Sequence, residues 1–301
     1  MPGMPSANPR FMRGISIKRF FSDLKMEVKD DNVSNGAAAL AYYFILAIFP
    51  AMIFLLTVLP YLPIPNLNQS IMDLLRQALP GDAANMFAGT VQQVTSQRQG
   101  GLLSFGFLLT LWAASNGLYA IMQQLNITYD VKEGRPFWKV RGTAILLTGA
   151  FAVLIIGALG LIVFGGTLQS WVVQFLGEGQ LVRTGFAILR WAIIVTALLL
   201  VFSLTYYYGP DVEQKFRFIS PGSAAGALLL IGASLLFKLY VDNFANYNAT
   251  YGSLGAVIIL MLWLNVAGMV ILLGSEINAL IEHYKNPEGK RKGEKELPKA
   301  A

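Results

Sequence analysis

The sequence predicts an all-α, polytopic membrane protein with six transmembrane helices. Two observations support this class. Charged residues make up only 13% of the 301 residues, about half of the ~25% that is usual in soluble domains. Several apolar stretches are also long enough to cross the ~30 Å hydrocarbon core of a bilayer, which takes about 20 helical residues. The absence of cysteine excludes disulfides, thiolate metal sites and cysteine nucleophiles.

Residues 1–31 are expected to form a cytoplasmic segment. Residues 1–12 are rich in proline, methionine and small residues, which predicts disorder. From residue 15 to residue 29, apolar side chains share one helical face with basic side chains around it: Phe20, Phe21, Leu24 and Val28, with Lys18, Arg19, Lys25 and Lys29. This pattern indicates an amphipathic helix on an anionic membrane surface, with a solvated helix packed on loops as the alternative. A cleavable signal peptide is not expected, because the segment is basic and polar.

Six apolar stretches make up the predicted membrane domain, residues 32–284. They cover approximately residues 36–59, 102–123, 143–168, 186–207, 221–241 and 251–275. Pro50 removes a backbone donor from the first span and is expected to kink it. The third span is rich in glycine, and Gly222 and Gly226 open the fifth with a small-residue spacing. Both features permit close contact between membrane helices.

Two polar regions complete the chain. Residues 66–100 are predicted to form a helical hairpin outside the membrane, because Pro80 and Gly81 break an amphipathic stretch and Asp82 can cap a second helix. The basic tail, residues 285–301, is expected to be disordered in the cytoplasm.

The distribution of lysine and arginine predicts the orientation. Of 23 such residues, 18 fall in the two termini and in the loops at 124–141 and 209–220, and three fall in the loops on the other side. The positive-inside rule therefore places both termini in the cytoplasm. The net charge of +6 thus indicates the anionic inner leaflet as a partner, and no nucleic acid.

Several motifs follow one another in a recognisable order. They are Ala41-Tyr42-Tyr43 with Phe49-Pro50, Leu111-Trp112-Ala113-Ala114-Ser115-Asn116 with Leu125-Asn126, Ser220-Pro221-Gly222, Tyr251-Gly252-Ser253-Leu254-Gly255-Ala256, and Leu272-Leu273-Gly274-Ser275-Glu276-Ile277-Asn278. Together they resemble the YihY/BrkB family of bacterial inner-membrane proteins over residues 20–283, although Asn265 stands where an aromatic or aliphatic residue would be expected. The resemblance implies a six-helix membrane protein and no settled activity. An older family label calls it a ribonuclease.

The residues do not supply a nuclease or another recognisable enzyme. His283 is the only histidine and lies beside the basic tail, whereas nucleases need clustered metal ligands or an acid–base pair in a cleft. The chain contains no G-x-S-x-G motif, P-loop or dinucleotide fingerprint. We therefore expect no catalytic residues, no metal and no cofactor. His283 is better explained as a charge that complements a helix C-terminus.

Polar side chains within the spans form a candidate cavity open to the cytoplasm. Its members are Tyr42, Tyr43, Asn116, Gln123, Asn265 and Glu276. An ionisable group inside a membrane is a functional hypothesis by default. Glu276 is therefore expected to face the bundle interior and to contact the second helix near Asn116, or the first near Tyr42 and Tyr43. The alternative is a set of hydrogen bonds that only clamps the helices together.

A second polar cluster is predicted toward the outer face, formed by Arg190, Lys238, Asp242 and Asn246. Lys238 and Asp242 are spaced to pair along a helix. Alternatively, the two basic side chains extend to the lipid headgroups.

These features leave two classes of function open. The first is transport or flipping of a lipid or small amphiphile through a cavity between helices. The second is a non-catalytic membrane scaffold in envelope assembly. A homo-oligomer or an envelope protein would be the partner in the second case.

Overall fold

The computed structural model describes residues 16–58, 100–177, 179–244 and 254–285. Within these ranges the chain is helical and contains no strand, which confirms the all-α class. The helices are α1 (Ile17–Asp30), α2 (Val33–Val58), α5 (Gly100–Thr128), α6 (Phe137–Leu176), α7 (Gln180–Tyr208), α8 (Pro221–Phe244) and α10 (Leu254–Lys285). The predicted hairpin, residues 1–12 and the tail from residue 286 onward lie outside the described residues.

Five of these helices are long and apolar enough to cross a membrane, namely α5, α6, α7, α8 and α10. Counted over its described side chains, α2 contributes a shorter apolar helix, Val33–Ile48. Its backbone nevertheless runs for 26 residues and contains Pro50, as predicted. At 1.5 Å per residue α2 is ~39 Å long, which exceeds the hydrocarbon core.

The helices extend beyond the apolar stretches that predicted them. The largest difference is in α6, which has 40 residues and begins at Phe137, directly after Pro136. A proline at a helix start has its backbone angle already set for the helix and loses no hydrogen bond. The hydropathy pattern located the membrane core but could not detect the polar turns that continue each helix into the interface. The predicted amphipathic segment is a helix, α1, on which Ile17 and Phe21 are exposed.

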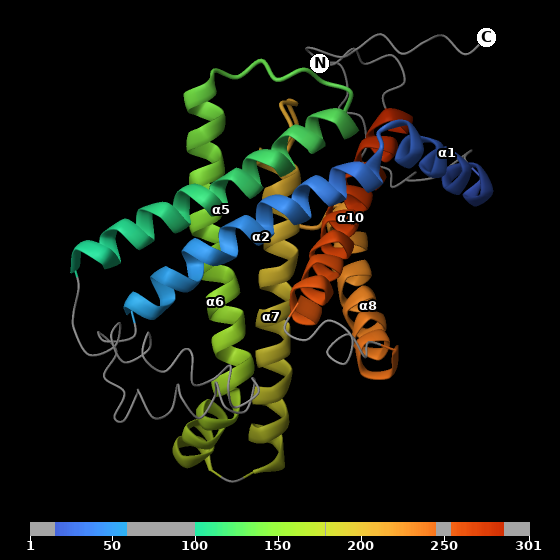
Figure 1. Ribbon diagram of the computed structural model, residues 1–301. Coiled ribbons are helices and arrows are strands. Elements are labelled where there is room, and N and C mark those ends of the chain that lie inside the picture. The colour runs from blue at the N-terminus through green and yellow to red at the C-terminus, as the bar shows by residue number, and fades with distance from the viewer. Residues whose placement is uncertain (1–15, 59–99, 178, 245–253, 286–301) are drawn as a thin grey trace, which may run out of the picture.

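The six long helices, drawn as ribbons in Figure 1, contact one another in a closed order that forms a ring. Helix α2 packs between α5 and α10, and α10 also packs on α8. On the other side, α5 packs on α6, α6 on α7, and α7 on α8, which closes the ring. Helix α1 lies against the ends of α10 and α2. In Figure 1, α2 and α5 cross the α6–α7 pair obliquely, and α6 and α7 continue together beyond that crossing.

The ring is packed tightly at one end only. We call this the loop end; it holds the α5–α6 connection (129–136), the α7–α8 connection (209–220) and the α1–α2 junction. Leu40, Leu125 and Leu272 are fully buried near it. The opposite parts of α6, α7 and α8, here called the distal halves (149–176, 180–200 and 228–244), expose large apolar side chains such as Val153 and Leu236. Such exposure is expected of surfaces that face lipid.

Helices α8 and α10 touch through glycine at the loop end. A Cβ atom added to Gly222 would overlap the carbonyl oxygen of Gly274, and one added to Gly274 would overlap the hydroxyl of Tyr206. The predicted close-contact motif of the fifth span is therefore confirmed. In the third span only Gly165 is approached closely, by the Arg190 side chain of α7, whereas no described atom lies within 4 Å of a Cβ added to Gly149, Gly157, Gly160 or Gly166.

The N-terminus of α8 is capped in part by a side chain of α10. Ser220 and Ser223 cap it reciprocally, since each backbone N–H donates to the other hydroxyl, at 2.8 and 3.0 Å. Asn278 of α10 accepts a hydrogen bond from the Gly222 N–H at 2.7 Å and donates to the Ser220 hydroxyl at 3.0 Å. These bonds satisfy donors that a helix start would otherwise leave without partners, and they fix the two helices side by side.

Candidate functional site

Two pockets open at the loop end and share one wall. The first, the α10 pocket, has a volume of about 300 Å³ and is bounded by α10 through Asn278, Ile281 and Glu282. The second, the α6 pocket, has a volume of about 620 Å³ and is bounded by α6 through Lys139 and Thr143. The shared wall consists of Tyr207, Glu213, Gln214 and Lys215. The α7–α8 connection therefore separates two polar hollows.

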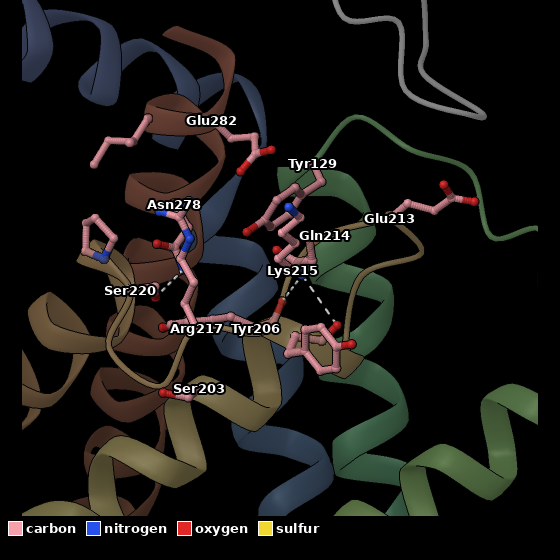
Figure 2. Close-up of a pocket in the computed structure, with 13 residues that line it drawn as sticks. Tyr129, Ser203, Tyr206, Glu213, Gln214, Lys215, Arg217, Ser220, Asn278 and Glu282 are labelled. Carbon is pink, nitrogen blue, oxygen red and sulfur yellow. Dashed lines mark hydrogen bonds between the residues drawn. The ribbon is translucent and has the colours of Figure 1, made fainter. Parts of the chain in front are cut away.

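The α10 pocket is lined by polar groups from four parts of the chain, as Figure 2 shows. Glu282 and Asn278 come from α10, Ser203 and Tyr206 from α7, and Tyr129 follows the end of α5. Lys215 and Arg217 come from the α7–α8 connection. The Glu213 side chain, in contrast, extends to the side in Figure 2, away from Asn278 and Glu282.

Backbone carbonyl groups hold the α7–α8 connection against the end of α7. The Gln214 side chain donates to the Tyr206 carbonyl, and the Ser203 hydroxyl donates to the Phe218 carbonyl. Tyr206 is buried and donates its own hydroxyl to the Ile271 carbonyl of α10 at 2.8 Å. The pocket floor is thus tied to both α7 and α10.

A second network anchors the α7–α8 connection to the α5–α6 connection. Asn126 donates to Glu133 at 2.9 Å and accepts from the Asp211 backbone N–H at 2.8 Å. Asp211 in turn accepts from the Gly134 N–H at 2.9 Å. Because Asn126 lies in α5 and is 5% exposed, these bonds connect both loops to the core.

Arg135 joins this network to the end of α7. Its guanidinium donates to the carbonyl groups of Tyr208 and Gly209 at 3.0 and 2.8 Å, and pairs with Glu133 at 2.7 Å. A cation at a helix C-terminus satisfies free carbonyl groups and opposes the negative end of the helix dipole. Burial raises the pKa of Glu133, but hydrogen bonds from Arg135 and Asn126 outweigh it and hold the pKa below its ordinary value.

Three cations at the pockets have no such partner. Within the described part of the chain, Lys139, Lys215 and Arg217 form no ion pair, whereas Asp211 lies 3.7 Å from Arg135. Exposed aromatic side chains stand beside them: Tyr207 meets both Tyr208 and Phe216 edge-on, at centroid distances of 4.6 and 5.2 Å. Aromatic rings with polar tips and unpaired cations are typical of the membrane–water interface.

The structure places the six residues of the predicted cavity in different surroundings. Tyr42, Tyr43 and Gln123 are exposed, Asn265 is half-buried, and Asn116 bonds to Arg141. None of the six lines either pocket described here.

Glu276 faces the bundle interior, as expected, since it is only 1% exposed. The predicted contact with Asn116 or with Tyr42 and Tyr43 is wrong. The groups that act on Glu276 are instead Asp31, Thr128 and Glu27, and Thr128 is twelve residues, or ~18 Å, from Asn116 along the helix. The error has a physical cause: α5 continues to Thr128 and α2 begins as early as Val33, so Glu276 meets the ends of these helices.

The predicted outer cluster stays a prediction, because the side chain of Asp242 and residue Asn246 lie outside the described part of the structure. Arg190 of α7 lies against Gly165 of α6, and its ring partner is Trp191 at 5.7 Å. Lys238 is exposed on α8. Asp242 belongs to α8, and Asn246 lies outside the described residues.

Sequence reasoning missed Arg141, which was counted among the loop residues. It lies inside α6, is 6% exposed, and donates to the Asn116 side chain at 2.7 Å and to the Trp112 carbonyl at 3.2 Å. Its guanidinium also stacks on the Trp112 ring, 3.7 Å from the centroid. The Trp112 and Asn116 motif residues thus have a structural role in holding α6. A second cation, five residues after Pro136 and within the first turns of a long apolar helix, is the signal that could have found it.

Within the described residues, no group of three or more His, Cys, Asp or Glu side chains is arranged to hold a metal ion. The sequence-predicted pocket residues are likewise absent from the two hollows. The candidate site is therefore the pair of pockets, with its unpaired cations.

Comparison with known proteins identifies related sequences but no related solved structure. A Bacillus subtilis (strain 168) protein, named as the ribonuclease-like protein YfkH, is 42% identical over 251 residues, covering 83% of this chain and 90% of the relative. A UPF0761 membrane protein of Aromatoleum aromaticum is 27% identical over 252 residues, which cover 82% of this chain and 60% of the relative. One from Aeromonas salmonicida is 25% identical over 270 residues, covering 85% and 87%. No solved structure matches the chain.

The family model described as virulence factor BrkB matches residues 25–298. Relatives named as membrane proteins agree with the five long apolar helices of the structure. The chain is therefore a multi-pass membrane protein that belongs to the BrkB family.

Proposed function

We propose that this protein transports or flips a lipid or small amphiphile whose head group carries a phosphate, and that the two loop-end pockets receive this head group. The observation that carries the proposal is the set of unpaired cations. Lys139, Lys215 and Arg217 line hollows of about 300 and 620 Å³ at helix ends. Phosphate oxygens are the partners that such cations prefer.

The surroundings favour an amphiphile over a free anion. Tyr208, Phe216 and Ile219 are exposed beside the pockets, so acyl chains could remain in the bilayer while the head group enters. The α6 pocket reaches down α6 from Lys139 to Thr143, which is one helical turn toward the membrane. The bias of lysine and arginine predicts that this end is cytoplasmic, where anionic lipids gather.

A lipid-translocation assay tests the proposal. Purified full-length protein is reconstituted into phosphatidylglycerol-containing liposomes with a fluorescent phospholipid, and a membrane-impermeant quencher reports the labelled lipid that reaches the outer leaflet. We expect faster translocation than in empty liposomes. Replacing Lys139, Lys215 and Arg217 together by glutamine should slow it by about tenfold or more, because each cation near an anionic surface contributes ~1 kcal/mol.

Lys132→Gln is the matched control. Lys132 is exposed on the α5–α6 connection and lines neither pocket, so its removal changes net charge without changing the site. Both proteins must show the same thermal unfolding. If the wild type moves no lipid, or if the triple variant is as active as Lys132→Gln, the proposal fails. The absence of any translocation would favour the alternative of a membrane scaffold.

A further inference from the structure

A buried carboxyl group on α10 has no cation beside it. Glu276 is 1% exposed and Ser275, next to it, is 0% exposed. One carboxyl oxygen of Glu276, Oε1, has no hydrogen-bond partner in the described part of the chain. No ion pair joins Glu276 to a lysine or arginine within the described residues. An ionised carboxylate in such a place would be very costly unless something neutralised it.

The groups that face Glu276 are polar or acidic. Asp31 of the α1–α2 junction, Thr128 of α5 and Glu27 of α1 are the groups that act on it. Around Glu27 stand Asp130, Asp30 and Asp23, with His283 of α10 opposing them. Burial and then these carboxylates raise the pKa of Glu27. Three elements therefore bring negative charge to one spot at the loop end.

Glu276 is buried, and Asp31 lies close enough to act on it. Two ionised carboxylates can only accept hydrogen bonds, so they cannot bond to each other unless one of the two carries a proton. Two like charges held close together also cannot both ionise without a large penalty. One proton bound between the two carboxyl groups would satisfy both conditions.

We propose that Glu276 and Asp31 form a buried proton-binding site that links α10 to the α1–α2 junction. The pair shares one proton when α1 lies against α10, and loss of that proton places two negative charges side by side and weakens the junction. Asp31 directly follows Asp30, the last residue of α1. Asp23, also in α1, accepts a hydrogen bond from the Tyr284 hydroxyl of α10. Release of the proton therefore acts on the docking of the amphipathic helix. This site is distinct from the two pockets and does not depend on the proposed function.

Infrared spectroscopy of the full-length protein in nanodiscs measures the proton directly. A protonated carboxyl group has its own carbonyl stretching band. We expect a wild-type band that persists above neutral pH and disappears in Glu276→Gln, because the amide can donate to Asp31 and leave it ionised. Asp31→Asn is the second variant, in case the first does not fold. Asp30→Asn, at the exposed neighbouring position, should leave the band unchanged.

Thermal unfolding gives a second readout with a defined sign. The folded protein holds a proton that the unfolded chain releases at neutral pH, so stability should fall as the pH rises from about 6 to about 9. Glu276→Gln should remove this dependence. A wild type without the band at neutral pH, or a band that survives both Glu276→Gln and Asp31→Asn, overturns the proposal. Stabilisation by added sodium or potassium that Glu276→Gln abolishes also overturns it, since a metal cation would then fill the site.

Discussion

The loop end and the distal halves use the same residue types in opposite ways. At the loop end, Gly222 and Gly274 let α8 and α10 meet backbone to backbone. In the distal halves, Gly157 and Gly232 have no atom within 4 Å of an added Cβ. A glycine in a membrane helix is therefore a packing residue only where a neighbouring helix approaches it, and the sequence pattern alone does not tell the two cases apart.

The two arginines inside the spans show the same contrast. Arg141 is enclosed at the loop end by the Asn116 side chain, the Trp112 carbonyl and the Trp112 ring. Arg190, in the distal part of α7, packs against Gly165. The Nε atoms of both arginines lack a hydrogen-bond partner among the described residues, so the contrast lies in the terminal nitrogens of Arg141 and in its ring partner. The difference indicates that the loop end is held by specific polar contacts, whereas the distal halves are held mainly by the bilayer around them.

The largest expected effect comes from adding one methyl group at the helix contact. Gly222→Ala should lower the free energy of unfolding by about 1–3 kcal/mol, because the new Cβ overlaps the Gly274 carbonyl oxygen. Gly232→Ala, its counterpart in the distal part of α8, should be neutral or stabilising by up to ~1 kcal/mol. Thermal unfolding of both variants in detergent measures the difference. Equal losses would mean that the two regions do not differ in packing.

The arginines give a smaller effect of the same kind. Arg141→Lys keeps the charge but loses the forked donor geometry, so it should cost about 0.5–1.5 kcal/mol. Arg190→Lys should cost less than ~1 kcal/mol, because a lysine there can still reach the headgroups. The same unfolding measurement applies. A larger loss at Arg190 than at Arg141 would reverse the comparison.

The smallest effect concerns pH at the loop end. Because the pKa of Glu133 is lowered in the folded protein, its stabilising contribution is present above the unfolded value of ~4.5 and is lost as the pH falls below it. The wild type should therefore lose stability on acidification, and Glu133→Gln should lose less over the same range. A variant with the full acid dependence of the wild type would show that Glu133 is not responsible. This dependence is opposite in sign to that expected of the Glu276–Asp31 pair.

The sequence predicted the helices well because long apolar stretches report directly on the membrane core. It also predicted that Glu276 would be buried, since an acid facing lipid would be very unfavourable. The partners of Glu276 could not be predicted, because they depend on where α5 ends and α2 begins. Those ends lie at Thr128 and Val33, within polar sequence that hydropathy does not resolve.

The pockets could not be predicted for a related reason. Their shared wall is the α7–α8 connection, which has no periodic pattern and is positioned by single bonds such as Gln214 to the Tyr206 carbonyl. Lys215 and Arg217 were counted from the sequence as charges on one side of the membrane. Only the fold shows that Lys215 and Arg217 both line the α10 pocket, and that Lys139 lines the neighbouring α6 pocket.

Mapping where an anionic phospholipid contacts the protein tests most directly whether the loop end is its lipid-binding region. Full-length protein in nanodiscs is irradiated with phosphatidylglycerol that carries a photoreactive head group, and the adducts are located by mass spectrometry. We predict that adducts concentrate at residues 207–217 and near Lys139, and that the triple glutamine variant loses them while Lys132→Gln keeps them. Adducts confined to the distal halves, or an unchanged yield in the triple variant, would contradict the assignment of the pockets.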